Sequence, residues 1–258
     1  MVAIERSPRP VGQGLEWYLP RLIAGVMFLV AAFSLYSIVS NAAFGAPGFD
    51  FRLYATATER WLSGGAFYEP HQLYGLYITT TEPMYPPVIV LLVAPFTVLP
   101  AMLWWLPMAI VTWRVLALRP SAWGRAGIAA CLAWPTTLHL VYTGNPAMWA
   151  CAALALATRW PWVSVFVFLK PSVFPFAFFG IRHRSWWVAL AICLLIAVPF
   201  GAMWLDWFAA ITNARGNFSG PLYSIRDFPL MLIPVVAYGS STRNQSTRII
   251  GVEAPSPP

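Results

Sequence analysis

The feature that most constrains this chain is a series of long apolar stretches with few charged residues inside them. From Pro86 to Leu118 the sequence is predominantly apolar, and this stretch exceeds the about 20 residues that one membrane-spanning helix needs. Charged residues make up only 10% of the chain, whereas soluble domains carry about 25%. The sequence therefore predicts an integral membrane protein of the all-α class, a polytopic bundle of transmembrane helices.

The first apolar stretch, Leu22 to Ser40, follows Arg6, Arg9 and Arg21. A signal-peptide core is roughly 7–15 residues long, and this stretch exceeds that length. We expect it to remain as an anchor in the cell membrane, with the amino terminus on the cytoplasmic side.

With the later apolar stretches included, the sequence predicts a bundle of about eight spans. Each of these stretches has about 20 residues or fewer, and one membrane-crossing helix needs about 20. The predicted domain covers residues 1–238, with a first external loop at 41–85, a second at 205–227 and a disordered tail at 239–258. The predicted spans are 22–40, 86–99, 101–118, 127–142, 147–158, 162–180, 186–204 and 228–238.

The topology of residues 86–118 can be interpreted in two ways. Pro95 and Pro100 favour a hairpin of two spans, which places the two large loops together on the outer face. One long span would separate those loops, and it agrees better with the positive-inside tendency at Arg119 and Arg125.

The first external loop contains an amphipathic segment. Asp50 is a suitable N-cap for a predicted helix over residues 51–63, which Gly64-Gly65 would end. One face carries Phe51, Tyr54, Ala55, Thr58, Trp61 and Leu62, and the other carries Arg52, Thr56, Glu59, Arg60 and Ser63. Such a helix is expected to lie flat at the membrane interface with its aromatic face towards lipid.

Several classes of function lack a signal in the sequence. We find no HExxH, paired CxxC, P-loop, G-x-S-x-G or Asp-x-Asp, so no metal site and no cofactor is predicted. The net charge of +7 is spread among the ends of loops, which favours contact with anionic membrane lipids and no nucleic-acid partner. The three cysteines lie in apolar stretches and are expected to be core residues.

Two charged residues could carry chemistry. Asp50 could accept a proton from a hydroxyl group at the edge of the membrane, or it could only cap its helix. Lys170 is the only lysine and lies in an apolar stretch, where a charge costs about 2.5–3.5 kcal/mol on insertion scales. It either extends to the membrane surface from a helix end or meets an anion such as a lipid phosphate.

Four sequence elements, in this order, resemble the integral-membrane glycosyltransferases of the GT-C type. They are Phe49-Asp50-Phe51-x-x-Tyr54, Trp61-x-x-Gly64-Gly65-x-x-Tyr68, Tyr85-Pro86-Pro87 and Leu169-Lys170-Pro171. The likeness is to glycosyltransferase family 87, the polyprenol-phosphate-mannose α-mannosyltransferase group. Tyr142-x-Gly144-Asn145-Pro146 stands where that family usually has Gly-Gln, and this chain has fewer predicted spans than the family, as a truncated relative would.

This resemblance implies an inverting transfer of a hexose, mannose by analogy, from a polyprenyl-phosphate donor to a lipid-linked or glycan acceptor at the outer face of the membrane. Asp50 would be the general base, and Lys170 with Arg52 would offset charge on the lipid phosphate. The substrate-binding residues implied are Arg52, Tyr54, Tyr68, Tyr85, Asn145 and Lys170. The alternative is a non-catalytic relative that binds, transports or scaffolds lipid-linked sugars.

Overall fold

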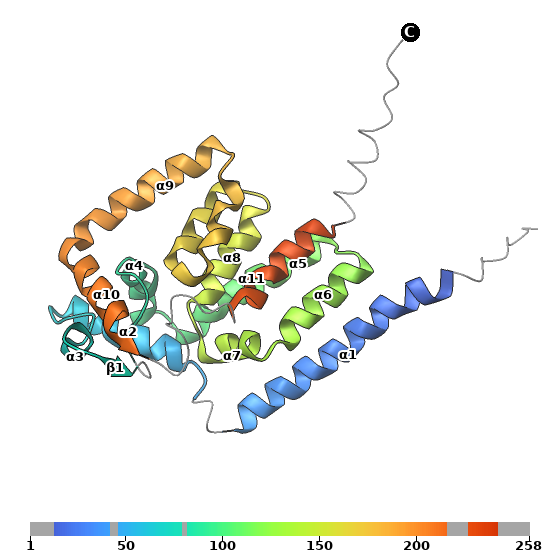
Figure 1. Ribbon diagram of the computed structural model, residues 1–258, viewed down its shortest axis with the longest axis horizontal. Helices are drawn as coiled ribbons and strands as arrows, with labels where there is room; N and C mark the ends of the chain where they lie inside the picture. Colours follow the sequence, from blue (N-terminus) through green and yellow to red (C-terminus); the bar gives the residue numbers. More distant parts are fainter. Residues whose placement is uncertain (1–12, 42–45, 79–81, 216–226, 242–258) are drawn as a thin grey trace, which may run out of the picture.

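A computed structural model describes residues 13–41, 46–78, 82–215 and 227–241, so most of the predicted disordered tail, from residue 242, lies outside the described residues. The described chain is helical apart from one pair of two-residue strands (Figure 1). The elements are α1 (Gln13–Ser40), α2 (Phe49–Leu62), α3 (Pro70–Leu73), β1 (Tyr77–Ile78), α4 (Ile89–Val93), η2 (Ala94–Thr97), η3 (Ala101–Trp105), α5 (Leu106–Leu118), α6 (Ala122–Ala133), α7 (Pro135–Thr143), α8 (Ala147–Ala157), η4 (Pro161–Leu169), η5 (Pro171–Gly180), α9 (Arg184–Ala197), η6 (Val198–Phe200), α10 (Gly201–Asn213), β2 (Ala214–Arg215) and α11 (Phe228–Gly239).

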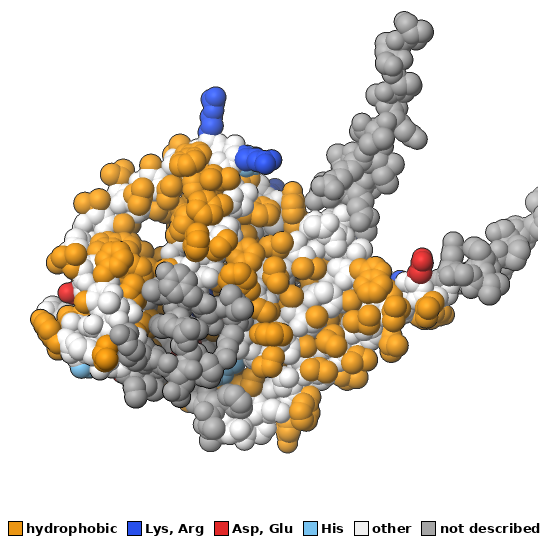
Figure 2. All heavy atoms as spheres, viewed as in Figure 1, with side chains coloured by type: hydrophobic (Ala, Val, Ile, Leu, Met, Phe, Trp, Pro, Cys, Tyr) orange, Lys and Arg blue, Asp and Glu red, His pale blue; other side chains and the backbone are white. Residues whose placement is uncertain are grey.

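Three helical runs within the described residues are long and apolar enough to cross a membrane: Gly14–Ser40, Ala101–Leu118 and Arg184–Asn213. A fourth crossing results if α7 and α8, which meet at a bend of 108°, are one broken span. Large apolar side chains point outwards from these runs; Phe33 on α1 and Leu195 on α9 are each 70% exposed. Figure 2 shows hydrophobic side chains spread over both helices, as expected of surfaces that face lipid.

The predicted eight spans do not appear as eight long helices. Pro100 separates α4 and η2 from the run at Ala101–Leu118, so the break predicted there is present. However, α4 and η2 together cover only Ile89–Thr97, too short for the first arm of a membrane-crossing hairpin. Pro135 begins a new helix inside the predicted span 127–142, and Pro171 divides the predicted span 162–180 into two 3-10 helices. Proline lacks the backbone N–H that a continuing helix requires, which accounts for these divisions.

Two hydrophobic clusters organise the described molecule. The first, which we call the aliphatic core, is rich in Ala, Leu and Val and joins α5, α6, α8, η4, η5 and α11. The second, the aromatic core, joins α2, α4 and α10 with the segments around Tyr68 and Tyr85, and Trp104 is its largest fully buried side chain. Met148 of α8 belongs to the aromatic core, whereas its neighbour Ala147 belongs to the aliphatic core. The start of α8 is therefore the border between the two.

The segments predicted as the two external loops lie side by side. β1 pairs in parallel with β2, and Asn213 Nδ2 donates to the carbonyl of Gln72 at 3.0 Å. The prediction of a loop from Leu205 is wrong in its first half, because α10 continues as helix to Asn213. Trp207 and Ala210 pack into the aromatic core, and this packing stabilises a helix that the mixed sequence did not reveal.

Helix α2 confirms the amphipathic segment but corrects two details. It begins at Phe49 after Gly48, so Asp50 lies in the first turn and is not the N-cap. Its aromatic face packs on protein, since the rings of Phe51 and Trp104 lie 5.0 Å apart, centre to centre. Among the side chains predicted for that face, Leu62 is 56% exposed, whereas Tyr54 is buried. The helix therefore presents Asp50 to the interior of the described structure.

Candidate functional site

The position of Asp50 is fixed by two close backbone approaches. Gly48 has the left-handed φ of +70°, and its N–H donates to the carbonyl of Tyr142 at 2.9 Å, which ties the start of α2 to the end of α7. Gly144, also left-handed at φ +72°, follows α7, and a Cβ there would lie 3.1 Å from the Cβ of Phe51. Glycine permits both conformations at little cost, so the half-buried Asp50 faces the break between α7 and α8.

Two side chains from this break hold one oxygen of the Asp50 carboxylate. Thr143 Oγ1 donates to Asp50 Oδ2 at 2.9 Å, and Asn145 Nδ2 donates to the same oxygen at 2.8 Å. Both donors come from a segment more than ninety positions away in sequence. Both groups donate to this oxygen, which can only accept from them. The arrangement therefore orients Asp50 as an acceptor.

The orientation of the Asn145 amide follows from its other contacts. Its Oδ1 accepts a hydrogen bond from the backbone N–H of Ala147 at 2.9 Å and another from the Tyr85 hydroxyl at 2.7 Å. A backbone N–H can only donate, so the oxygen of the amide must face Ala147. The amide nitrogen then faces Asp50, which can only accept when ionised.

Tyr85 lies at the centre of a group of buried tyrosines. Its ring packs edge-on against Tyr54 at 5.2 Å between centres, and its backbone carbonyl accepts a hydrogen bond from the Tyr68 hydroxyl at 2.7 Å. Burial raises the pKa of the Tyr85 phenol well above its ordinary value, and the carboxylates of Asp227 and Asp50 raise it further. Tyr85 therefore keeps its proton and donates it to Asn145 as a hydrogen bond.

Lys170 completes the chain of contacts from the boundary between η4 and η5. Its Nζ donates to the Tyr85 hydroxyl at 2.9 Å and forms an ion pair with Asp227 Oδ2, also at 2.9 Å. The side chains of Lys170 and Asp227 are only 9% and 13% exposed. A buried ammonium group requires such a partner, because desolvation without one is costly. Of the two interpretations of Lys170, the structure thus has it meeting an anion, which is the protein's own carboxylate.

The structure brings most of the expected site residues together and separates one from them. Asp50, Asn145, Tyr85 and Lys170 form one hydrogen-bonded chain, which we call the Asp50–Lys170 chain, and Tyr54 and Tyr68 support it. Arg52, which was grouped with Lys170, instead points away from α2 and donates to the carbonyl of Pro47 at 2.7 Å. The expectation that Arg52 and Lys170 share one phosphate therefore has no contact to support it.

Two members of the site were not singled out as binding residues. Asp227 lies 57 positions after its partner Lys170, so local sequence gave no sign of the ion pair. Thr143 directly precedes the Gly144-Asn145 element, so its nearness to Asn145 was a usable signal. Its orientation towards Asp50 depends on the turn at Gly144, which the sequence pattern did not predict.

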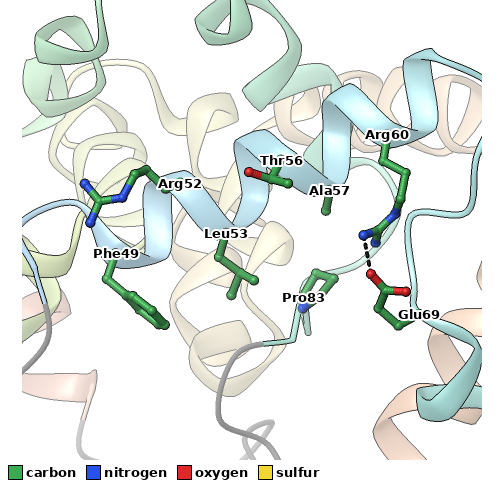
Figure 3. Close-up of a pocket in the computed structure, with 8 residues that line it drawn as sticks. All are labelled: Phe49, Arg52, Leu53, Thr56, Ala57, Arg60, Glu69 and Pro83. Atoms are coloured by element: carbon green, nitrogen blue, oxygen red, sulfur yellow. Dashed lines mark hydrogen bonds and ion pairs between the residues drawn. The ribbon is translucent and has the colours of Figure 1, made fainter.

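A groove of about 330 Å³, which we call the α2 groove, runs along α2; Phe49, the chain neighbour of Asp50, is among its lining residues, but Asp50 itself is not. Figure 3 shows Arg52 at one end of this groove, Thr56 in the middle, and the Arg60–Glu69 ion pair at the other end. Arg60 also donates to the carbonyl of Phe67 at 2.8 Å, so it holds the loop that follows α2. The groove is lined by Phe49, Arg52, Leu53, Thr56, Ala57, Arg60, Glu69 and Pro83.

An apolar cavity of about 620 Å³ lies at the Lys170 end. Its lining includes Pro86 and Leu169, which are the chain neighbours of Tyr85 and Lys170. Its other walls come from α4, η4, α9 and α10. The residues that line it are Pro86, Val88, Leu91, Leu92, Val165, Phe166, Phe168, Leu169, Leu190, Cys193, Leu194, Ile196, Ala197 and Trp204. This cavity suits a hydrocarbon chain whose polar end lies near Lys170.

Among the described residues, no three His, Cys, Asp or Glu side chains are grouped so that they could hold a metal ion. The Asp50–Lys170 chain itself offers a carboxylate, an amide, a phenol and an ammonium group. Comparisons of the chain with protein-family models, with curated proteins and with solved structures each found no match.

Proposed function

We propose that this protein is a membrane glycosyltransferase that takes a hexose, mannose in the first instance, from a polyprenyl-phosphate donor and passes it to a lipid-linked or glycan acceptor. The observation that carries the proposal is the Asp50–Lys170 chain, which has a carboxylate at one end and, beside an apolar cavity, a buried ammonium group at the other. A sugar attached to a lipid by a phosphate requires this set of groups: a base, a cation and a lipid groove.

The proposed reaction is an inverting displacement. The acceptor hydroxyl gives its proton to the carboxylate of Asp50, and its oxygen forms a bond to the anomeric carbon of the sugar. The bond from that carbon to the phosphate oxygen breaks, and its electron pair leaves with the lipid phosphate. Lys170 offsets the negative charge that grows on the departing phosphate. No nucleotide sugar takes part in this scheme.

The ion pair between Lys170 and Asp227 sets a condition on donor binding. A donor phosphate must either share the ammonium group with the Asp227 carboxylate or displace it, because the two anions approach the same Nζ. Electrostatic repulsion between the two anions would favour displacement of the Asp227 carboxylate by the donor phosphate. We place the catalytic face on the outer side and the amino terminus in the cytoplasm, because Arg6, Arg9 and Arg21 precede or begin the first apolar stretch and positive charge favours the cytoplasmic side.

A second candidate function is the binding of lipid-linked sugars without catalysis. It is favoured by the fact that Asp50 Oδ2 already accepts two hydrogen bonds inside the protein, as a purely structural carboxylate would. Such a protein would use the apolar cavity and Lys170 but would need no base.

The test is a transfer assay with the purified full chain in lipid nanodiscs. The protein is supplied with radiolabelled polyprenyl-phosphate mannose and a membrane extract as the source of acceptors, and a nucleotide-linked mannose serves as the control donor. We expect a labelled product from the lipid-linked donor only. Saturable donor binding without any product, under the same conditions, would replace the enzyme with the binding protein.

A further inference from the structure

The Asp50–Lys170 chain has a direction that its chemistry fixes. Lys170 can only donate, so its hydrogen bond ends on the oxygen of the Tyr85 hydroxyl. Tyr85 must then donate its own proton to Asn145 Oδ1, an atom that can only accept. Asn145 in turn donates through Nδ2 to Asp50. Every hydrogen bond therefore points from the cation towards the carboxylate.

We infer that Tyr85 and Asn145 are positioning residues that couple the charge of Lys170 to the carboxylate of Asp50, so that the two ends of the chain act as one unit. The coupling itself rests on this geometry, and its use in catalysis rests on the proposed function. Hydrogen bonds arranged in one direction polarise one another, and the effect is larger in a buried environment of low dielectric constant.

The coupling is one of polarisation and not of proton transfer. An amide such as that of Asn145 does not accept a proton on its nitrogen, so the link cannot carry a proton from one end to the other. The raised pKa of the Tyr85 phenol agrees with this, because it keeps the tyrosine neutral while it donates. The backbone N–H of Ala147 prevents the Asn145 amide from turning over and reversing the direction.

The experiment measures how readily Asp50 is protonated, by a method that needs no sugar transfer. An apolar carbodiimide reacts with protonated carboxyl groups, and mass spectrometry of the peptide that contains Asp50 gives the labelled fraction at each pH. The full chain is labelled in detergent across the acidic range. The pH at which labelling of Asp50 falls by half is the measured quantity.

The variants form a cycle. We expect Lys170→Gln to move the midpoint for Asp50 upwards by about one pH unit, because the hydrogen bonds that end on the carboxylate are no longer polarised by the ammonium group at the other end of the chain. Tyr85→Phe should move it in the same direction, and Lys170→Gln should add little more in the Tyr85→Phe background. Tyr77→Phe is the matched control, since its hydroxyl is also buried but donates to the carbonyl of Ala210. That control should leave the midpoint unchanged.

The single variants keep every other charge constant. The titratable and charged groups on α2, on α7 and along the chain are Arg52, Tyr54, Glu59, Arg60, Tyr68, Tyr85, His139, Tyr142, Lys170 and Asp227. If Lys170→Gln alone does not fold because Asp227 loses its partner, the whole cycle is run in the Asp227→Asn background, so that Lys170→Gln again changes one charge only.

Equal shifts from the Lys170 substitution with and without the Tyr85 hydroxyl would overturn the inference, because the charge would then act through space alone. The labelling result can be distinguished from the result of the sugar-transfer assay that tests the proposed function. A coupled midpoint in a protein that transfers no sugar would leave the inference intact and end the enzyme proposal. Transfer with an uncoupled midpoint would do the reverse.

Discussion

The apolar cavity and the α2 groove differ in chemistry, although each is lined by a chain neighbour of a residue in the same hydrogen-bonded chain: Leu169 precedes Lys170, and Phe49 precedes Asp50. The cavity at the Lys170 end is lined almost wholly by hydrocarbon side chains, whereas the α2 groove carries two guanidinium groups, a carboxylate and a hydroxyl. In the proposed reaction, the lipid tail of the donor would occupy the first and the acceptor would occupy the second. The proposal then has the donor phosphate meet the ammonium group of Lys170 and the acceptor hydroxyl meet the carboxylate of Asp50.

The largest expected effect is that of removing the positive charge of Lys170, at the donor end of the chain. Lys170→Ala leaves Asp227 as a buried charge without its partner, and breaking a buried ion pair costs about 3–5 kcal/mol. We expect a large fall in the unfolding temperature and loss of donor binding, measured by thermal unfolding and by binding of polyprenyl-phosphate mannose. Lys170→Arg should restore only part of the affinity, because a planar fork replaces a compact charge. Donor affinity equal in all three proteins would exclude a phosphate contact.

The apolar cavity can be tested by filling it. Ala197 lines the cavity on α9, while Ala191 on the same helix is exposed and does not line it. We expect Ala197→Trp to weaken binding of a long-chain donor about tenfold, which corresponds to about 1.4 kcal/mol. Ala191→Trp, the matched control, should bind the donor as the wild type does. Similar affinities for both variants would show that the lipid lies elsewhere.

The α2 groove can be tested in the same way, with a smaller expected effect because the Thr56 side chain is exposed. Thr56 lies in the groove, and Glu59 is an exposed residue of α2 outside its lining. We expect Thr56→Trp to raise the KM for the acceptor several-fold, while donor binding stays unchanged. The steady-state KM for acceptor and the Kd for donor are the readouts, and Glu59→Trp serves as the control. A change in donor binding alone would reverse the assignment of the two cavities.

The smallest expected effect is on the stability of the protein at alkaline pH. Burial raises the pKa of Tyr85 in the folded protein, and an unfolded tyrosine ionises near its ordinary pKa of about 10. The neutral buried phenol therefore contributes stability that is complete below about pH 10 and is lost as the pH rises above that value. Tyr85→Phe should flatten this decline, measured as unfolding temperature from pH 8 to pH 11. An equally steep decline in the variant would assign the effect to other groups.

These comparisons also show what local sequence can reveal. The alternation of aromatic and polar residues predicted a helix at 51–63, which is observed at Phe49–Leu62, and Phe228–Gly239 was foreseen as a short apolar helix. The periodicity of a helix is a local property, so the pattern finds it. Asp50 was predicted as the N-cap, but the observed N-cap is Gly48, two positions earlier, because the bond from Gly48 to Tyr142 sets the start of α2 through a distant contact.

The site was foreseen as residue types but not as a set of contacts. A carboxylate at Asp50 and an unusual Lys170 stand out in the sequence, yet nothing local indicates that Tyr85 joins Asn145 to Lys170. Those partners are brought together by the packing of the aromatic core against the aliphatic core. Of the about eight predicted spans, the described residues show three or four helical runs long enough to cross a membrane, because Pro135 and Pro171 divide stretches that were predicted as single spans.

The most direct test of the central claim is the rate of mannose transfer by Asp50→Asn at saturating polyprenyl-phosphate mannose, measured beside the wild type. The substitution keeps the shape of the side chain and an oxygen that can accept from Thr143 and Asn145, but it removes the base. We predict a fall in kcat of about 10²–10⁴-fold, with the unfolding temperature and donor affinity of the wild type. Transfer at the wild-type rate would contradict the account.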